Sequence, residues 1–397
     1  MNQSIYDAVV IGGGPSGATA ATDLALAGHS VLLIERGGRI KPCGGAIPPR
    51  LLADFDIPQS LLVAKARSAR MIAPSGRAVD MPVGEIGYVG LVDREEFDEW
   101  LRERARLSGA ERLTATFEKI ERDDAAHPLV TFRRSRGGPI ESVRARLVIG
   151  ADGARSAVAK QCLPGAERIP CVFAYHEIIK SPRQNSDAFD ASRCDVYYQG
   201  RLSPDFYAWV FPHGDTASIG VGSANKGFSL RGAIATMRDD LGLDRCETVR
   251  REGAPIPLKP LKRWDNGADV IVAGDAAGVV APASGEGIYY AMVGGRVVAE
   301  AGAAFLKTGD AKLLRTARKR FMKEHGTVFW VLGMMQYFWY SSDKRRERFV
   351  TMCDDKDVQE LTWQAYMHKK LVRAKPLAHV KIFLKDTAHL LGLRPAT

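Results

Sequence analysis

The sequence predicts an α/β protein: a doubly wound, mostly parallel sheet interrupted by a mostly antiparallel β domain and followed by a helical, basic C-terminal region. Three observations support this class. A glycine-rich turn at residues 12–17 follows the apolar run Tyr6 to Ile11. A second glycine-rich turn, at residues 274–278, follows the apolar run Val270 to Ala273. Between them, residues 171–222 form short alternating stretches rich in Tyr, Phe and Trp, which is typical of antiparallel strands.

The individual elements follow from local composition. Residues 6–11 are apolar and β-branched, which predicts a buried parallel strand, and the alanine-rich residues 15–27 predict a helix. Residues 29–34 predict a second strand, and residues 68–83 alternate around Pro74-Ser75-Gly76 as a hairpin does. Further elements are expected as a helix from Val92 and strands over 114–121, 129–132 and 145–150, with a last helix from Gly285 to Leu306.

These elements predict three regions. Residues 1–67, 88–165 and 268–306 form a Rossmann-like nucleotide-binding domain, residues 68–87 and 166–267 a substrate-binding β domain, and residues 307–397 the helical region. A chain of 397 residues, 46% of them hydrophobic, can bury a large core. The six cysteines have no C-x-x-C spacing, so we expect reduced thiols. The first strand begins almost at Met1, which indicates a cytoplasmic protein without a signal peptide.

The first glycine-rich turn predicts a dinucleotide site. Gly12 permits the tight turn, Gly14 lets the backbone approach a diphosphate, and Gly17 lets the helix pack on the strand. The diphosphate then lies at the positive N-terminus of a helix. The second strand ends in Glu35, whose carboxylate can accept both hydroxyls of an adenosine ribose and would repel a 2′-phosphate. The bound dinucleotide is therefore predicted to be FAD or NAD and not NADP.

The second glycine-rich corner favours a cofactor too long for one site. Asp275 offers an acid to a ribityl hydroxyl, and Gly285-Glu286-Gly287 begins a new helix. The N-terminus of that helix can stabilise the negative charge that develops on the pyrimidine side of a reduced flavin. Together the two corners predict FAD. Each feature also has an explanation without a cofactor. The Gly-Asp corner can be an ordinary capped helix, and the helix dipole favours an acid such as Glu286 in the first turn.

Positive charge is concentrated at the C-terminal end. Residues 311–397 contain 18 Lys and Arg against 8 Asp and Glu, so they carry the whole formal net charge of +10. Within them, residues 327–340 form an apolar, aromatic run with basic flanks that is too short to span a bilayer. We predict a helix that lies on an anionic membrane surface or covers an apolar pocket, with Phe329, Trp330, Phe338 and Trp339 either inserted at the interface or closing the mouth of an apolar tunnel. A buried helix is the alternative. No nucleic-acid motif accompanies the charge, so nucleic acid is not an expected partner.

Several motifs resemble a known flavoprotein family. The N-terminal fingerprint, Asp152-Gly153 and Gly274-Asp275 are similar to the fold shared by aromatic hydroxylases and geranylgeranyl reductases. Lys41-Pro42-Cys43-Gly44-Gly45-Ala46 resembles the cysteine-glycine-glycine loop of the reductases, and residues 206–212 resemble their aromatic-x-Trp-x-Phe-Pro motif. Gly278 stands where the hydroxylases commonly have histidine. Residues 348–353, 361–366 and 376–379 resemble the subgroup of chlorophyll and bacteriochlorophyll biosynthesis.

The resemblance implies an oxidoreductase that uses NADPH to saturate isolated double bonds of a geranylgeranyl group, giving phytyl. The group would be esterified to chlorophyll or bacteriochlorophyll, or present as the free diphosphate. FAD would be bound tightly without a covalent link, NADPH would dock transiently, and the protein would lie peripherally on a photosynthetic membrane. No metal site is expected. The implied cofactor contacts are Gly12, Gly14, Pro15, Ser16, Gly17, Glu35, Arg36, Cys43, Gly44, Gly45, Ala46, Arg94, Asp152, Gly274, Asp275, Gly285, Gly287 and Ile288, and the implied substrate contacts are Tyr207, Trp209, Phe211 and Pro212.

Cys43 is the predicted catalytic residue. An isolated alkene has no carbonyl to accept charge, so hydride transfer requires a proton donor beside the alkene. In this fold the loop after Glu35 passes the flavin ring, which makes Cys43 the candidate. A free thiol is a weak acid, so packing against the flavin is the alternative. Arg94 reaches the FAD diphosphate or pairs with acids of its own helix, and Asp152 assists the dinucleotide or forms an ordinary turn.

The aromatic motif has two interpretations as well. Alternation places its three aromatic rings on one face of a strand, where they line a prenyl tunnel or form an ordinary core. An FAD-dependent aromatic monooxygenase and an archaeal-type prenyl-lipid saturase are the alternative enzymes, and a flavin-free prenyl carrier is the alternative outside catalysis. The sequence makes no prediction about oligomeric state.

Overall fold

The computed structural model describes residues 5–38 and 40–369. Their contacts divide the chain into two compact units, which are described separately. Unit 1 takes its described residues from Met1–Cys43, Asp93–Phe173 and Ala254–Gly333, and unit 2 from Gly44–Val92, Ala174–Gly253 and Met334–Thr397.

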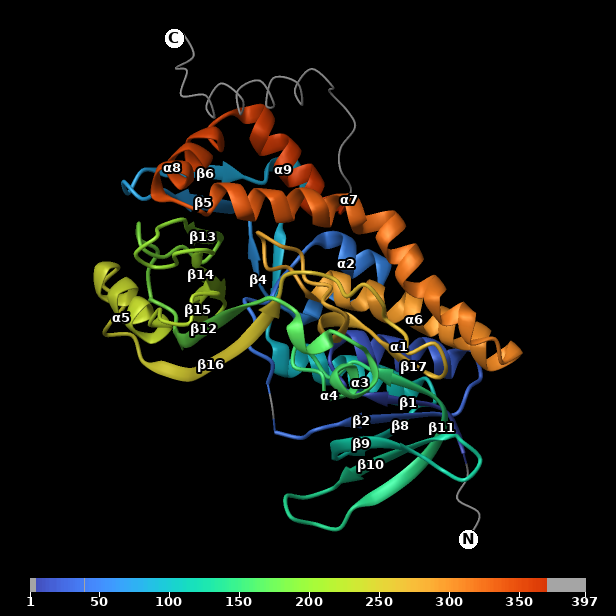
Figure 1. Cartoon of the computed structure of the whole chain (residues 1–397). Coiled ribbons are helices and arrows are strands. Elements are labelled where there is room, and N and C mark those ends of the chain that lie inside the picture. The colour runs from blue at the N-terminus through green and yellow to red at the C-terminus, as the bar shows by residue number, and fades with distance from the viewer. Residues whose placement is uncertain (1–4, 39, 370–397) are drawn as a thin grey trace. The chain divides into compact units, whose positions relative to one another are not determined.

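Unit 1 is built on a seven-stranded sheet of order β8-β2-β1-β11-β10-β9, in which β17 also pairs with β11 (Figure 1). Its strands are β1 (Tyr6–Ile11), β2 (Val31–Glu35), β8 (Glu111–Thr114), β9 (Thr116–Arg122), β10 (Pro128–Arg133), β11 (Glu141–Gly150) and β17 (Val270–Val272). Its helices are α1 (Pro15–Leu26), α3 (Arg94–Leu107), α4 (Ala157–Cys162), α6 (Ile288–Thr308) and the 3-10 turns η3 (Ala166–Arg168), η4 (Gly274–Ala277) and η5 (Ala311–Leu314).

The parallel half of this sheet confirms the predicted doubly wound fold. β1 pairs in parallel with both β2 and β11, and β11 pairs in parallel with β17. These strands are almost wholly buried, as expected where helices cover both faces of a parallel sheet. The first half of β11 pairs in the antiparallel sense with β10, which extends the sheet beyond the parallel strands. Pro15 begins α1, where its fixed φ suits the first helical turn.

Unit 2 contains a seven-stranded sheet of order β16-β12-β15-β14-β13-β5-β6 and a three-stranded sheet of order β3-β7-β4. Its strands are β3 (Ala46–Ile47), β4 (Leu62–Ala66), β5 (Ser68–Ile72), β6 (Ala78–Pro82), β7 (Val89–Val92), β13 (Arg193–Tyr197), β14 (Ala208–His213) and β15 (Thr216–Ser223). Its helices are α2 (Pro49–Asp54), α5 (Leu230–Asp240), α8 (Asp343–Met352), α9 (Lys356–His368) and the 3-10 turns η1 (Gln59–Leu61) and η2 (Gly84–Ile86). The hairpin predicted around Pro74-Ser75-Gly76 is confirmed, since β5 pairs in the antiparallel sense with β6.

Three elements run through both units: β12 (Cys171–Lys180), β16 (Thr248–Pro257) and α7 (Arg315–Trp339). The contacts also divide the chain at residues other than the predicted boundaries. Residues 44–67, assigned from the sequence to the nucleotide-binding domain, belong to unit 2 because β3 and β4 pair with β7. The helical C-terminal region is not a unit of its own, since residues 307–333 belong to unit 1 and the described residues after them to unit 2.

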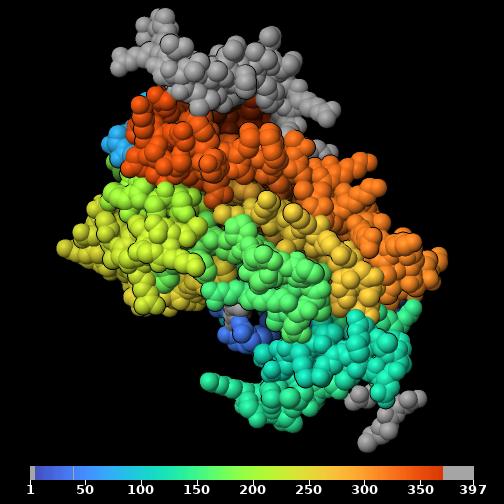
Figure 2. Space-filling view, viewed as in Figure 1, coloured from blue at the N-terminus to red at the C-terminus, as the bar shows by residue number. Residues whose placement is uncertain are grey.

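The apolar run of the C-terminal region lies in α7, drawn in orange in Figures 1 and 2. Phe329 and Trp339 are buried against other aromatic rings, so they are not exposed for insertion at a membrane interface; the alternative, that they close a tunnel mouth, stays a prediction. Trp330, Met334 and Tyr337 are exposed, by 63%, 51% and 86%. None of the helices in the described part of the chain has the length and hydropathy needed to cross a membrane.

Candidate functional site

The glycine-rich turn of unit 1 has the geometry of a phosphate cradle. Gly12 has φ +102°, and a Cβ there would lie 2.3 Å from the Ala151 carbonyl oxygen, so only glycine fits. A Cβ on Gly17 would lie 1.8 Å from the Gly12 oxygen, which shows how closely α1 packs on the turn. A Cβ on Gly14 would meet no described atom within 4 Å. The backbone at Gly14 is therefore open to a diphosphate at the start of α1.

Ser16 joins this turn to the second glycine-rich segment. A Cβ on Gly274, which has φ +62°, would lie 2.7 Å from the Cβ of Ser16. A Cβ on Gly295 of α6 would lie 2.3 Å from the Ser16 carbonyl oxygen. The Ser16 Oγ is buried, and no residue in the described part of the chain hydrogen bonds to it. A buried hydroxyl at a helix N-terminus suits the oxygens of a bound phosphate, so the site fits a dinucleotide that contacts both segments.

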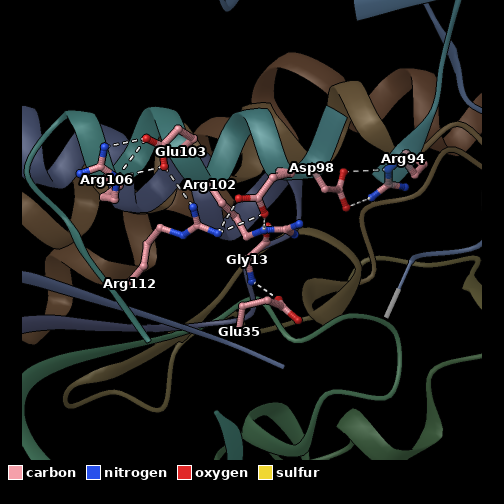
Figure 3. Close-up of polar contacts among 9 residues, drawn as sticks. Gly13, Glu35, Arg94, Asp98, Arg102, Glu103, Arg106 and Arg112 are labelled. Carbon is pink, nitrogen blue, oxygen red and sulfur yellow. Dashed lines mark hydrogen bonds and ion pairs between the residues drawn. The ribbon is translucent and has the colours of Figure 1, made fainter. Parts of the chain in front are cut away.

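Glu35, the residue predicted to bind the adenosine ribose, lies beside this turn. Its Oε2 accepts a hydrogen bond from the Gly13 N–H, and Arg102 donates to the Gly13 carbonyl oxygen at 3.3 Å (Figure 3). Burial raises the pKa of Glu35, while the Gly13 hydrogen bond and the nearby Arg102 oppose that rise. Arg36 is exposed, and its backbone N–H also stabilises the Glu35 carboxylate. Glu35 is thus fixed beside the turn, where an acceptor for ribose hydroxyls is needed.

Asp275 lies near the N-terminus of α6 and pairs with Lys41, a residue that the sequence analysis did not assign. The Asp275 side chain is only 9% exposed. A Cβ on Gly287, which precedes Ile288 and caps α6, would lie 3.7 Å from Asp275 Oδ1. Gly285 donates its N–H to the Ala281 oxygen at 3.0 Å, closing the turn before the helix. This arrangement places one carboxylate, one ammonium group and a helix N-terminus together.

Arg94 holds the cysteine of the loop. It is 5% exposed and donates to both carboxylate oxygens of Asp98, at 2.8 and 2.7 Å (Figure 3). Burial lowers the pKa of Arg94, but Asp98 and a hydrogen bond with the Cys43 side chain raise it above its usual value. The structure therefore gives Arg94 a pairing with an acid of its own helix and a contact with the Cys43 sulfur. A contact of Arg94 with the FAD diphosphate stays a prediction.

Asp152 acts as a helix cap. Its carboxylate accepts from Ser156 Oγ at 2.5 Å and from the Ala157 N–H at 2.6 Å, at the start of α4. Burial raises its pKa, while these hydrogen bonds act in the opposite direction. The Asp152 backbone nitrogen would lie 2.9 Å from a Cβ on Gly12. The turn containing Asp152 thus shapes the cradle, and a direct contact with the dinucleotide stays a prediction.

In unit 2, the rings of the aromatic motif lie side by side along β14 and the residue before it, Tyr207. The ring centroids are 5.9 Å apart for Tyr207 and Trp209 and 6.2 Å apart for Trp209 and Phe211, as alternation along a strand predicts. Pro212, whose position alternates with these, is buried. A Cβ on Gly44 would lie 3.0 Å from Phe211 and 3.7 Å from Trp209 Nε1. The residue after Cys43 therefore packs on the aromatic motif, and Ala46 continues into β3.

Three rings outside the aromatic motif, those of Tyr198, Tyr340 and Phe349, pack beside it in unit 2 and were not predicted from the sequence. Tyr198 lies 6.2 Å from Tyr207, 5.4 Å from Tyr340 and 5.0 Å from Phe349, measured between ring centroids. Phe206 stacks on Tyr207 at 4.2 Å. The sequence shows that residues 197–211 and 337–349 are both rich in aromatic residues, but it does not show that these two segments are in contact. The cluster extends the apolar surface of β14 toward α7 and α8.

Two glycine-rich segments meet at the buried Ser16, and Glu35 and Cys43 belong to the same unit. These features are typical of flavin-dependent oxidoreductases. The comparisons narrow this class. The chain is 60% identical over 390 residues to a geranylgeranyl diphosphate reductase of Rhodobacter capsulatus, covering 98% of both chains. It is 36% identical to a Synechocystis geranylgeranyl diphosphate reductase, covering 96% of this chain and 97% of the other. The chain belongs to the geranylgeranyl reductase family.

Other comparisons concern the fold. A family model described as lycopene cyclase protein matches residues 7–176. A geranylgeranyl bacteriochlorophyll reductase-like protein from Thermoplasma acidophilum superposes with a TM-score of 0.80 at 21% identity, covering 96% of this chain and 99% of that one. A p-nitrophenol 4-monooxygenase from Pseudomonas putida superposes with a TM-score of 0.70 at 19% identity, covering 92% of this chain and 98% of that one. At these identities the monooxygenase shares the fold alone, so the hydroxylase alternative is not favoured.

Proposed function

We propose that this enzyme uses NADPH to saturate isolated double bonds of a geranylgeranyl group to give phytyl, on the free diphosphate or on a (bacterio)chlorophyll ester. The names of the relatives at 60% and 36% identity support the geranylgeranyl substrate. The observation that carries the proposal is the packing of Gly44 against Phe211 and Trp209. Phe211 and Trp209 offer the kind of apolar surface that a prenyl chain requires, and Gly44, which packs on them, follows Cys43 directly in the chain.

The residues of the cradle would hold FAD, which supplies the hydride when bound. Gly14 and the Ser16 hydroxyl would hold its diphosphate, Glu35 would accept its ribose hydroxyls, and Asp275 would bind its ribityl chain. The N-terminus of α6 would stabilise negative charge on the reduced flavin. The sequence has no second G-x-G-x-x-G segment, so NADPH docks transiently.

Cys43 would deliver the proton that accompanies the hydride. Arg94 and Asp98 orient the Cys43 sulfur, since Arg94 contacts both groups. The faces of Trp209 and Tyr207 stabilise the cationic character that protonation creates on an alkene carbon, and their apolar surface excludes water from it.

The test is an anaerobic incubation of the flavin-loaded protein with NADPH and either geranylgeranyl diphosphate or geranylgeranyl-bacteriochlorophyll, followed by mass spectrometry. We expect a gain of two hydrogens for each reduced double bond and none when NADPH is omitted. NADPH oxidation only in air, with an oxygen atom inserted into a substrate, would favour a monooxygenase instead.

We also propose that the exposed face of α7 docks on the anionic surface of the photosynthetic membrane. Trp330, Met334 and Tyr337 recur at helical spacing, so they share one face of α7. Lys323, two turns before Trp330, is exposed. Lys344, which follows α7 closely in the chain, is exposed as well. An amphipathic helix with basic neighbours binds such surfaces peripherally.

Vesicle binding tests this docking. We expect the protein to bind anionic vesicles less at high ionic strength but not to detach fully, since salt screens charge and not apolar insertion. Trp330→Ala should weaken binding and reduce the shift in Trp emission, while Thr327→Ala, an exposed position on the same helix, should not. Failure of the unmodified protein to bind anionic vesicles at low salt would refute the docking.

A further inference from the structure

A chain of hydrogen bonds crosses four neighbouring strands of unit 2 and ends on the aromatic motif. The strands lie in the order β16, β12, β15, β14. Glu252 Oε2 on β16 lies 2.9 Å from His176 Nε2 on β12. His176 Nδ1 lies 3.0 Å from Ser218 Oγ on β15. Ser218 Oγ lies 3.1 Å from Trp209 Nε1 on β14.

The direction of each bond follows from the chemistry of the groups. An indole N–H only donates, so Trp209 donates to Ser218 Oγ. The Ser218 hydroxyl can then donate its own hydrogen to His176 Nδ1, which leaves the Nε2–H of His176 to donate to the Glu252 carboxylate. This assigns one tautomer to His176. Every polar group in the chain is then satisfied, which a buried network requires.

Three of the four residues in this chain of hydrogen bonds are buried, and the side chain of the fourth, Glu252, is 11% exposed. The exposed fractions are 3% for His176, 0% for Ser218 and 6% for Trp209. At its far end Glu252 also forms an ion pair with Arg250, in which Oε1 and Nε are 2.6 Å apart, and this pairing holds the carboxylate in place. Bonds of this kind are strongest where water does not compete for them, so the network can hold an aromatic ring in one orientation.

Gly220 leaves the space that this orientation needs, and Gly44 packs beside the indole nitrogen. Gly220 lies opposite Trp209 on β15, and a Cβ there would lie 2.0 Å from the indole Cζ2. A Cβ on Gly44 would lie 3.7 Å from the indole nitrogen, on the segment that follows Cys43. The indole is therefore fixed by hydrogen bonds at its nitrogen and by close packing at its six-membered ring.

We propose that Ser218, His176 and Glu252 are positioning residues that fix the indole of Trp209 and thereby set the binding of the prenyl chain. The proposal rests on the proposed function, since it assigns Trp209 to the surface that receives the substrate. The three residues touch neither substrate nor cofactor; they act through Trp209. Their loss should raise KM for the prenyl substrate and leave the reduction of bound flavin by NADPH unchanged.

The experiment compares Ser218→Ala and His176→Asn with a matched control, Tyr175→Phe. Ser218→Ala removes the partner of the indole with almost no change of volume. His176→Asn keeps an acceptor near the position of Nδ1 and loses the bond to Glu252. Tyr175 neighbours His176 on β12, but its hydroxyl donates to Glu177, outside the chain, at 3.1 Å.

We expect Ser218→Ala to raise KM about three- to tenfold, the effect of one lost buried hydrogen bond, with little change in kcat. His176→Asn should give a smaller increase, and Tyr175→Phe none. In protein labelled with 15N-tryptophan, the indole N–H resonance of Trp209, assigned by its absence in Trp209→Phe, should move upfield in Ser218→Ala. A role confined to stability would lower the unfolding midpoint without changing KM or moving this resonance selectively.

An unmoved Trp209 resonance or an unchanged KM in Ser218→Ala would overturn the inference, since either result means that the chain does not set the position of the indole. The proposed function is judged separately, by whether the unmodified enzyme reduces a geranylgeranyl group at all. If it does not, equilibrium titration of geranylgeranyl diphosphate onto the same variants still decides whether the chain controls prenyl binding. Equal affinities across the variants would then overturn the inference.

Discussion

Replacing Gly220 by alanine should damage the aromatic motif more than a glycine-to-alanine change in a strand normally does. In the interior of a strand alanine is normally better than glycine by roughly 0.5–1 kcal/mol, because glycine loses more backbone entropy on folding. Here the new Cβ would lie 2.0 Å from Cζ2 and 2.3 Å from Cε2 of Trp209. Atoms cannot approach so closely, so either the indole must leave its site or the strands must separate.

The cost can be bounded from the burial of that ring. Trp209 is 6% exposed, and loss of a buried Trp side chain costs about 3–5 kcal/mol. After subtraction of the entropy gain, Gly220→Ala should destabilise unit 2 by about 2–4 kcal/mol. Prenyl turnover should fall with it, while reduction of bound flavin by NADPH should be nearly unchanged.

The assay is urea unfolding followed by circular dichroism, applied to a double-mutant cycle. In the Trp209→Ala background the new Cβ no longer meets an indole, so Gly220→Ala should be neutral or stabilising there. The reasoning is refuted if the change is harmless in the unmodified protein, or if it costs the same free energy in both backgrounds.

Three further predictions concern the cofactor and the thiol. Glu35→Arg should reduce FAD retention at limiting FAD, since it replaces the ribose acceptor by a cation; full retention would remove Glu35 from the site. Gly274→Ala should reduce FAD retention more than Gly309→Ala does: both positions have positive φ, but only the Cβ at position 274 would meet Ser16, and equal effects would argue against the joined cradle. Cys43→Ala should leave NADPH-driven bleaching of the flavin intact and slow its reoxidation by the prenyl substrate; normal turnover would leave Cys43 with a packing role.

The parallel strands of unit 1 could be predicted because each of them has a recognisable pattern within its own few residues. The buried parts of β1, β2 and β17, residues 8–11, 31–34 and 270–272, are continuous apolar runs, and a buried parallel strand requires no more. The unit boundaries could not be predicted in the same way. Residues 44–67 join unit 2 because their strands pair with β7, and a pairing between distant segments leaves no local periodicity. The resemblance at residues 376–379 falls outside the described residues.

In the candidate site, too, features made by neighbouring residues could be predicted and contacts between distant residues could not. The spacing of the glycines and of Glu35 was readable because a turn, a helix start and the end of a strand follow one another in the chain. The hydrogen-bond partners of His176 could not be predicted from the sequence, because Ser218 and Glu252 are 42 and 76 residues away along the chain. Trp330 and Trp339 belong to one apolar run, yet one is exposed and the other buried, and hydropathy alone does not separate them.

The loop that carries Cys43 shows how such distant contacts give a short motif its meaning. In unit 1, Lys41 pairs with Asp275, which lies 234 residues further along the chain, and Cys43 contacts Arg94 of α3. Neither partner belongs to the loop. The position of the sulfur is therefore set by charges on other elements, and a lysine at position 41 is explained by the carboxylate it meets.

Gly44 and Gly45, which follow Cys43 and belong to unit 2, are explained by the lack of space for a side chain. Any side chain at Gly44 would press on the Phe211 ring. Gly45 has φ +70°, and a Cβ there would lie 2.5 Å from the Val92 oxygen and 2.7 Å from His213 Nε2. Only glycine avoids both the backbone strain and the overlap, so alanine at position 45 would force the loop away from β14. The glycines thus allow the backbone at Gly44 and Gly45 to approach the aromatic strand β14, and this close approach explains the two glycines of the cysteine-glycine-glycine sequence.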